Sequence, residues 1–191
     1  MPREEFPCML SELYYASISL SEVDVKVLKA IIFDLGDTLI QEEQKLGRTY
    51  VKVPYVLETL NQLTAEYKLG IITNVHPSTT ESRIHEILQL AGIHDFFEVI
   101  IISSIVGFEK PDERIFHLAF EQLGVLASEA VMIGNRVSAD IRGGNRVGMI
   151  TILLKWNDRY PEPSLIEEEK PDYIISSYKQ LKSILRKLRN E

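Results

Sequence analysis

Four polar clusters in this sequence carry side chains that could do chemistry together. Asp34, Thr73, Lys110 and the pair Asn135 and Asp140 all follow short apolar runs, with Lys110 a few residues beyond its run. A carboxylate can attack phosphorus and form an aspartyl-phosphate, and Mg²⁺ is usually held by one or two carboxylates together with phosphate and water. Threonine and lysine could hold and neutralise the transferring group. These residue types therefore predict metal-assisted phosphoryl chemistry.

The first cluster follows residues 30–33, Ala-Ile-Ile-Phe, an apolar run without polar alternation. Such a run is typical of a strand buried on both faces inside a parallel sheet. Ligands bind at the carboxyl ends of strands in open α/β sheets, so Asp34 would lie where chemistry is usually done. The other interpretation is that Asp34 only begins a turn, because Asp and Gly are frequent turn residues.

The elements that must position these residues alternate along the chain. The pattern predicts strands at 30–34, 68–72, 97–103, 130–134, 149–154 and 173–175. Helices are expected at 54–67, 79–92, 111–123, 138–147 and 177–189, with a loop or short hairpin at 41–52. Helices and strands that alternate in this way indicate βαβ units with right-handed crossovers. The expected fold is α/β, a three-layer Rossmann-like fold with a central parallel sheet flanked by helices. Gly143, Gly144 and Gly148 resemble a nucleotide-binding loop only loosely and are expected instead to allow close packing of a helix on this sheet.

Composition limits the class of protein. A chain of 191 residues that is 45% hydrophobic and 26% charged suits one soluble α/β domain. The net charge of −7 predicts no nucleic-acid partner. The single cysteine, Cys8, excludes an internal disulfide framework and suits a reducing compartment. No apolar run approaches the roughly 20 residues that span a bilayer, and no secretory signal is evident. We expect a cytoplasmic protein without a membrane partner, and an oligomer is left open.

The four clusters resemble, in order, the motifs of the haloacid dehalogenase-like (HAD) hydrolase superfamily. They are Asp34-Leu35-Gly36-Asp37-Thr38, Ile72-Thr73-Asn74, Lys110-Pro111-Asp112, and Gly134-Asn135 followed by Asp140. The resemblance implies that Asp34 is the nucleophile and that Thr73, Asn74 and Lys110 bind the substrate phosphate. It also implies a Mg²⁺ site built from Asp34, the Gly36 backbone, Asn135 and Asp140. The substrate would be a phosphorylated small molecule or an exposed phosphate on a larger molecule.

The spacing of the motifs bears on the cap domains of this superfamily. Those mobile domains insert after the first motif or between the second and third, and neither interval is long enough here. We therefore expect no large cap domain. Residues 24–191 are expected to form the hydrolase domain and residues 1–23 an N-terminal extension.

Two positions depart from the pattern of the superfamily's phosphatases. Gly36 stands where those enzymes usually carry an Asp as general acid and base, and loss of such a group typically costs about 10²–10⁴-fold in rate. Asp37 is the candidate replacement, because residues three apart share a face if the chain turns helically there. Glycine at position 36 could also hold a positive φ that Asp tolerates less well. Asn135 stands where Asp is more common, so Asp140 would have to carry more of the metal binding.

Several functions remain open from the sequence. The leading hypothesis is a Mg²⁺-dependent phosphohydrolase that acts through an aspartyl-phosphate. The alternative is a catalytically weak protein of this fold that binds a ligand or a partner. A phosphoryl-receiving signalling domain is disfavoured, because its acceptor Asp lies on a middle strand. A dehalogenase is disfavoured by the missing cap.

Overall fold

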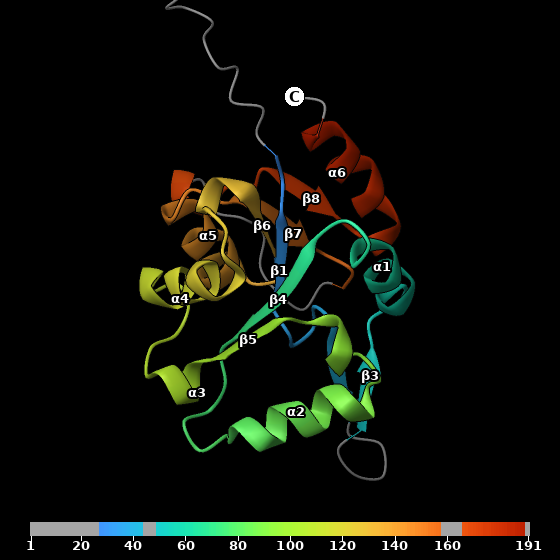
Figure 1. Cartoon of the computed structure of the whole chain (residues 1–191), viewed down its shortest axis with the longest axis vertical. Helices are drawn as coiled ribbons and strands as arrows, with labels where there is room; N and C mark the ends of the chain where they lie inside the picture. The colour runs from blue at the N-terminus through green and yellow to red at the C-terminus, as the bar shows by residue number, and fades with distance from the viewer. Residues whose placement is uncertain (1–26, 44–48, 158–165, 190–191) are drawn as a thin grey trace, which may run out of the picture.

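The computed structural model describes residues 27–43, 49–157 and 166–189, arranged around one main sheet (Figure 1). The sheet has six strands in the order β5-β4-β1-β6-β7-β8, and each neighbouring pair is parallel. The strands are β1 (Ala30–Phe33), β4 (Lys68–Thr73), β5 (Val99–Ile102), β6 (Ala130–Gly134), β7 (Ile150–Leu154) and β8 (Tyr173–Ile175). All six predicted strands are therefore confirmed. The predicted extension at residues 1–23 lies outside the described residues.

The central strand β1 is buried on both faces, as its composition predicted. Ile31 and Phe33 point into one apolar cluster, whereas Ala30 and Ile32 point into another. All four residues are fully buried. This alternation follows from the two-residue period of a strand. Because β1 pairs with β4 on one side and β6 on the other, it forms the middle of the sheet.

Helices cover both faces of the sheet. They are α1 (Val56–Leu63), α2 (Glu81–Leu90), α3 (Ser103–Val106), α4 (Glu113–Leu123), α5 (Arg142–Arg146) and α6 (Leu181–Leu188). Short 3₁₀ turns lie at His94–Phe96, Ala127–Glu129, Glu167–Glu169 and Tyr178–Gln180. The buried residues of α1, α2 and α6 join the cluster that contains Phe33, and those of α4 join the cluster that contains Ile32. The predicted three-layer α/β architecture is confirmed (Figure 1).

Three local expectations needed correction. Pro111 lies before α4 and not in its first turn, because Asp112 caps the helix by accepting a hydrogen bond from the Arg114 N–H. The helix expected at 138–147 begins instead as a π-helical turn, Val137–Ile141, and continues as α5. The short helix α3 was not expected. The helix α2 is capped at its N-terminus by Thr80, whose side chain accepts a hydrogen bond from the Arg83 N–H.

The segment between β1 and α1 is a small antiparallel hairpin of β2 (Ile40–Glu43) and β3 (Thr49–Lys52). The interval between β4 and β5 holds α2 and one 3₁₀ turn. In the described parts of the chain, neither interval contains a cap domain. Across these same parts, no helix is long and apolar enough to cross a membrane.

Close packing of α5 on the neighbouring elements depends on two adjacent glycines. A Cβ atom at Gly143 would lie 2.4 Å from the Phe116 ring, and one at Gly144 would lie 2.7 Å from Thr151 Cγ2. Real Cβ atoms do not approach other heavy atoms this closely. The predicted packing role is therefore confirmed for this pair. It is wrong for Gly148, which has a φ of 80° and no atom within 4 Å of an added Cβ.

We expect Gly143→Ala to lower the free energy of unfolding. Overpacking of a core costs about 1–3 kcal/mol, and the fully buried Phe116 ring leaves little room to relax. This cost should exceed the roughly 1 kcal/mol that alanine gains over glycine in a helix. Urea denaturation would measure the change. Gly36→Ala is the matched control, because no atom lies within 4 Å of its added Cβ; equal stability of the two variants would contradict the prediction.

Candidate active site

The site lies at the carboxyl ends of the three central strands. Asp34 follows β1, Thr73 ends β4, and Asn135 follows β6. The chain progresses outward from β1 in one direction through β4 and β5, and in the other through β6, β7 and β8. Ligands in open α/β sheets bind at such a switch point.

A cavity of about 310 Å³ opens at this edge of the sheet. Its polar lining consists of Asp34, Gly36, Asp37, Thr73, Asn74 and Arg136. Five of the eight predicted site residues therefore meet at one cavity. The other three, Lys110, Asn135 and Asp140, are buried directly behind it.

Lys110 holds the acidic groups of the site together. Its Nζ lies 2.7 Å from Asp34 Oδ1 and 2.7 Å from Asp140 Oδ1, and it donates a 2.7 Å hydrogen bond to the Ile72 carbonyl. Only 3% of the Lys110 surface is exposed. Burial alone would lower the pKa of Lys110, but the nearby Asp140 and Asp34 carboxylates outweigh it and the pKa is raised. Lys110 is therefore charged, and its three protons face protein oxygens.

Asp140 is completely buried and engaged on both oxygens. Oδ1 pairs with Lys110, and Oδ2 accepts a 2.9 Å hydrogen bond from the Arg136 N–H. Burial raises the pKa of Asp140 to about 6, against the lowering effect of Lys110. The carboxylate fits because residue 134 is glycine: a Cβ there would lie 2.2 Å from Asp140 Oδ2.

Thr38 connects Asp34 to Asn135 on the other side of the nucleophile candidate. Its Oγ1 lies 3.1 Å from Asp34 Oδ2 and 3.1 Å from Asn135 Oδ1. Thr38 itself is fully buried. Asp34 is therefore oriented through both oxygens, by Lys110 on one and Thr38 on the other.

Asn74 forms two hydrogen bonds with the backbone of Lys110. Its Nδ2 donates to the Lys110 carbonyl at 2.8 Å, and its Oδ1 accepts from the Lys110 N–H at 2.9 Å. The sequence predicted Asn74 as a phosphate ligand. In the structure its amide fixes the Lys110 loop while one edge of the residue faces the cavity.

The conformation after Asp34 differs from one expectation. Gly36 does not have a positive φ, whereas Asp37 does, at 55°. Asp is one of the few residues that visit this left-handed region readily. The Asp37 N–H donates a 2.7 Å hydrogen bond to the Ile40 carbonyl. The strained position is therefore Asp37, and Gly36 has open space around it.

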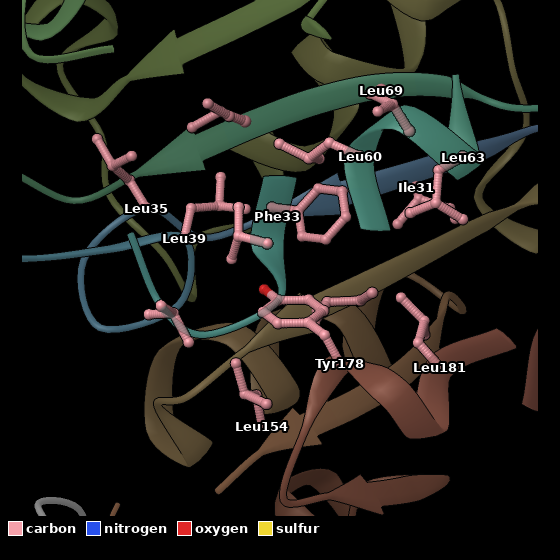
Figure 2. Packing of buried hydrophobic residues seen from close by; sticks show 14 of the residues in the cluster. Ile31, Phe33, Leu35, Leu39, Leu60, Leu63, Leu69, Leu154, Tyr178 and Leu181 are labelled. Atoms are coloured by element: carbon pink, nitrogen blue, oxygen red, sulfur yellow. The ribbon is translucent and has the colours of Figure 1, made fainter. Parts of the chain in front are cut away.

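Two aromatic side chains from the C-terminal part of the chain anchor this loop. The Trp156 indole N–H donates to the Asp37 carbonyl at 2.7 Å, and the Tyr178 hydroxyl donates to the Thr38 carbonyl at 3.0 Å. Figure 2 shows Tyr178 beside Phe33, with Leu39 and Leu154 around it. Burial and the nearby Asp34 raise the pKa of Tyr178 well above its ordinary value, so the phenol keeps its proton. These contacts fix the backbone on both sides of the Asp37–Thr38 peptide.

Sequence reasoning gave no role to Thr38, Arg136 or Tyr178, and for Trp156 it favoured local packing over a position at the site entrance. Thr38 is the last residue of the first motif, and its hydroxyl, four residues after Asp34, could have indicated a contact with the Asp34 carboxylate. Arg136 carried the signal of a cation in the loop between Asn135 and Asp140. Trp156 and Tyr178 had no such signal, because the contacts they make are more than 100 residues away in sequence.

No group of three or more His, Cys, Asp or Glu side chains forms a metal cage among the residues that the structure describes. This leaves the magnesium prediction open, because Mg²⁺ commonly uses only one or two protein carboxylates. His85 and His94 do meet, with Nδ1 of one 2.8 Å from Nε2 of the other. Their contact is a hydrogen bond.

The six parallel strands flanked by helices define an α/β protein of the Rossmann-like type, with an acidic site at the carboxyl edge of the sheet. A family model described as haloacid dehalogenase-like hydrolase matches residues 44–148, more than half of the chain. The chain belongs to this family, as the four motifs predicted.

Curated relatives include glyceraldehyde 3-phosphate phosphatases. The one from Methanopyrus kandleri is 37% identical over 139 residues, which cover 71% of this chain and 57% of that protein. The one from Pyrococcus furiosus is 38% identical over 141 residues, covering 73% and 57% respectively. The pyrimidine 5′-nucleotidase YjjG of Escherichia coli is 33% identical over 136 residues, covering 71% and 57%. The chain thus spans little more than half the length of these relatives.

Solved structures agree on the fold. An uncharacterized protein from Listeria monocytogenes serotype 4b superposes with a TM-score of 0.74 at 27% identity, covering 86% of this chain and 100% of that one. A HAD phosphatase from Thermococcus onnurineus gives a TM-score of 0.69 at 23% identity, covering 83% and 98%. The second likeness is evidence of the fold alone.

We expect Lys110→Met to lower the free energy of unfolding by about 3–5 kcal/mol, because it leaves two buried carboxylates without their cation. The loss should be smaller at pH 5 than at pH 8. Asp140 already has a raised pKa of about 6, and without Lys110 it would take up a proton more readily and relieve the repulsion. Urea denaturation at the two pH values would measure both effects.

The control is Lys29→Met, which breaks the exposed ion pair with Glu129. That loss should be much smaller, because exposed pairs contribute little. Equal losses for the two variants, or a Lys110→Met loss that does not depend on pH, would show that the buried cluster is not what Lys110 stabilises.

Proposed function

We propose that this chain is a Mg²⁺-dependent phosphohydrolase in which Asp34 attacks the phosphorus of a phosphate monoester. The observation that carries this proposal is the position of Asp34. Its carboxylate lies at the cavity, is 6% exposed, and is held by Lys110 on Oδ1 and Thr38 on Oδ2. A carboxylate oriented in this way is prepared for in-line attack.

The proposed reaction has two steps. An Asp34 oxygen forms a bond to phosphorus while the ester P–O bond breaks, and the leaving alkoxide takes a proton. Water then attacks the phosphorus of the aspartyl-phosphate, which releases inorganic phosphate and restores the Asp34 carboxylate. Thr73 and Arg136 line the same cavity and can hold the phosphate oxygens. Lys110 lowers the negative charge at Asp34 from behind without facing the substrate.

We propose Asp37 as the acid that protonates the leaving group. It lines the cavity with Asp34, and its backbone is fixed by Trp156 and by Ile40. Gly36, where the family's phosphatases usually have this acid, offers no side chain. The αL conformation of Asp37 places the next carboxylate along the chain at the same cavity.

The residues present fit a magnesium ion. Two carboxylates, Asp34 and Asp140, contact one buried ammonium group, and a third, Asp37, lines the same cavity as Asp34, so the site carries excess negative charge. We propose the Asp34 carboxylate, the Gly36 carbonyl and Asn135 as ligands. Asp140 would bind directly only after one of its oxygens left Lys110 or the Arg136 N–H. A bound Mg²⁺ would neutralise phosphate oxygens during transfer.

The side-chain amide of Asn135 has an atom that could contribute to metal binding. Its Nδ2 is buried and has no hydrogen-bond partner among the described residues. The Thr38 hydroxyl has one proton, so it can donate to Asp34 or to Asn135 but not to both. With the amide turned around, Nδ2 would donate to Thr38 and Oδ1 would be the atom left over. That neutral oxygen would then be available as a metal ligand.

The relatives support a phosphate ester as the substrate. Four of the curated relatives that are 34% to 38% identical are named glyceraldehyde 3-phosphate phosphatase. The chain covers only 57% to 58% of their length. The names of these relatives and our proposal have a phosphorylated substrate in common.

A second candidate function is ligand or partner binding with little catalysis. The observation that favours it is the pair of departures, Gly36 and Asn135, at two positions where the family usually has carboxylates. The two candidates differ in turnover, which the following variants measure.

Asp34→Asn should abolish hydrolysis and leave the fold intact. The amide is isosteric but a poor nucleophile, and Lys110 keeps both Asp140 and the Ile72 carbonyl as partners. Release of inorganic phosphate from a panel of phosphate monoesters, with Mg²⁺ and with EDTA, would measure this. Turnover by Asp34→Asn at the wild-type rate would rule out the covalent mechanism, and turnover unchanged by EDTA would rule out the metal.

Gly36→Asp should raise turnover if catalysis lacks a well-placed acid. The added side chain has room, because nothing lies within 4 Å of its Cβ and the backbone needs no positive φ. The gain is bounded by the roughly 10²–10⁴-fold that general acid catalysis supplies. Steady-state kinetics of wild type and variant on the same ester would measure it.

The matched experiment is Asp37→Asn, which keeps a residue that accepts the αL conformation. If Asp37 is the acid, this change should cost about 10²-fold or more in kcat, and Gly36→Asp should then gain little in the wild type but restore the double variant. If wild type and Gly36→Asp both fold and bind Mg²⁺ yet hydrolyse nothing, the binding function replaces the phosphohydrolase.

A further inference from the structure

The cavity has apolar lining residues in addition to the polar residues proposed to bind phosphate. Ile40 and Tyr50 come from the β2–β3 hairpin, and Ile84 and Ile87 come from α2. Figure 1 shows the hairpin beside the carboxyl-terminal end of α2. The two elements are joined there, because Lys52 Nζ donates a 2.7 Å hydrogen bond to the Ala91 carbonyl.

Polar groups beside these apolar residues are few. The Tyr50 hydroxyl accepts a 3.4 Å hydrogen bond from Arg83, whose guanidinium lies 5.6 Å from the centre of the Tyr50 ring. The amide of Asn74, at the boundary, is committed to the Lys110 backbone. Several hydroxyl groups on a ligand would therefore lose water here without finding partners, which is costly.

The size of the cavity limits the ligand further. A volume of about 310 Å³ is at the low end of the roughly 300–1,000 Å³ of small-molecule sites. Part of it must hold the phosphoryl group beside Asp34 and Thr73. The remaining space suits one ring or a short alkyl chain.

Resting on the phosphohydrolase function proposed above, we infer that the substrate is a small phosphate monoester whose organic group is apolar. The phosphoryl group lies at Asp34, Thr73 and Arg136. The organic group packs between the hairpin and α2, against Tyr50, Ile84 and Ile87. The hairpin and α2 thus select the substrate.

Two esters of primary alcohols separate this inference from a preference for polyol phosphates. Benzyl phosphate and glycerol 3-phosphate have leaving groups of similar reactivity but opposite polarity. We expect kcat/KM for benzyl phosphate to be at least about tenfold higher, since a single methylene in an apolar pocket already contributes about 10–200-fold. Initial rates of phosphate release would give both values.

Ile87→Thr tests the apolar wall with a side chain of similar shape. It should lower kcat/KM for benzyl phosphate about tenfold, mainly through KM, and lower that for glycerol 3-phosphate by a smaller factor. Leu90→Thr is the matched control, because Leu90 lies on the same helix, is 72% exposed and does not line the cavity. Tyr50→Ser provides a second test at a half-buried position if Ile87→Thr does not fold.

The outcomes distinguish the inference from the function on which it rests. Hydrolysis of both esters with equal efficiency, or a preference for glycerol 3-phosphate, overturns the apolar assignment and leaves the phosphohydrolase intact. A preference that survives Ile87→Thr and Tyr50→Ser also overturns it. If neither ester is hydrolysed, the proposed function fails. Titration calorimetry then tests whether the cavity binds an apolar organic group. Tighter binding of benzylphosphonate than of methylphosphonate supports the apolar assignment, and equal affinities overturn it.

Discussion

The contact of one buried ammonium group with two buried carboxylates is the constraint on which the rest of this site depends. Lys110 lies 2.7 Å from an oxygen of Asp34 and 2.7 Å from an oxygen of Asp140. Removing charges from water costs several kcal/mol each, and only close pairing with further hydrogen bonds offsets it. The neighbouring contacts supply those bonds: Ile72 and Asn74 hold Lys110, Arg136 holds Asp140, and Thr38 holds Asp34. The position of the nucleophile candidate is thus determined by the same network that makes its burial tolerable.

The network also explains why three of the eight predicted residues do not line the cavity. Lys110, Asn135 and Asp140 support the site from behind, while Asp34, Gly36, Asp37, Thr73 and Asn74 line it. A group that neutralises charge does not need to touch the substrate, because electrostatic interactions are strong in a region without water. A small cavity can therefore combine high local charge with an apolar wall from the hairpin and α2.

The departures at Gly36 and Asn135 change the charge of the site in one direction. Each replaces a position where the family's phosphatases usually carry a carboxylate, so the cluster has fewer negative charges for Lys110 and a metal to balance. Asp37 returns one carboxylate to the cavity, and its left-handed backbone is held by hydrogen bonds with Trp156 and Ile40. Strained backbone of this kind persists only where surrounding contacts determine it.

The sequence by itself determined the strands, the alternation of strands and helices along the chain, and five residues of the cavity: Asp34, Gly36, Asp37, Thr73 and Asn74. Ile31, Ile32 and Phe33 had to form a doubly buried strand, and parallel strands had to bring Asp34 and Thr73 to one edge, because both follow from local periodicity and from the geometry of βαβ units. The packing role of Gly143 was likewise visible in the local pattern. Tertiary structure alone decided that Lys110 turns inward to Asp140, that Asp37 and not Gly36 has the positive φ, and that Trp156 and Tyr178 anchor the loop. These contacts join residues about 30 to 140 positions apart. No local pattern encodes them, because each depends on which side chains the folded sheet brings together.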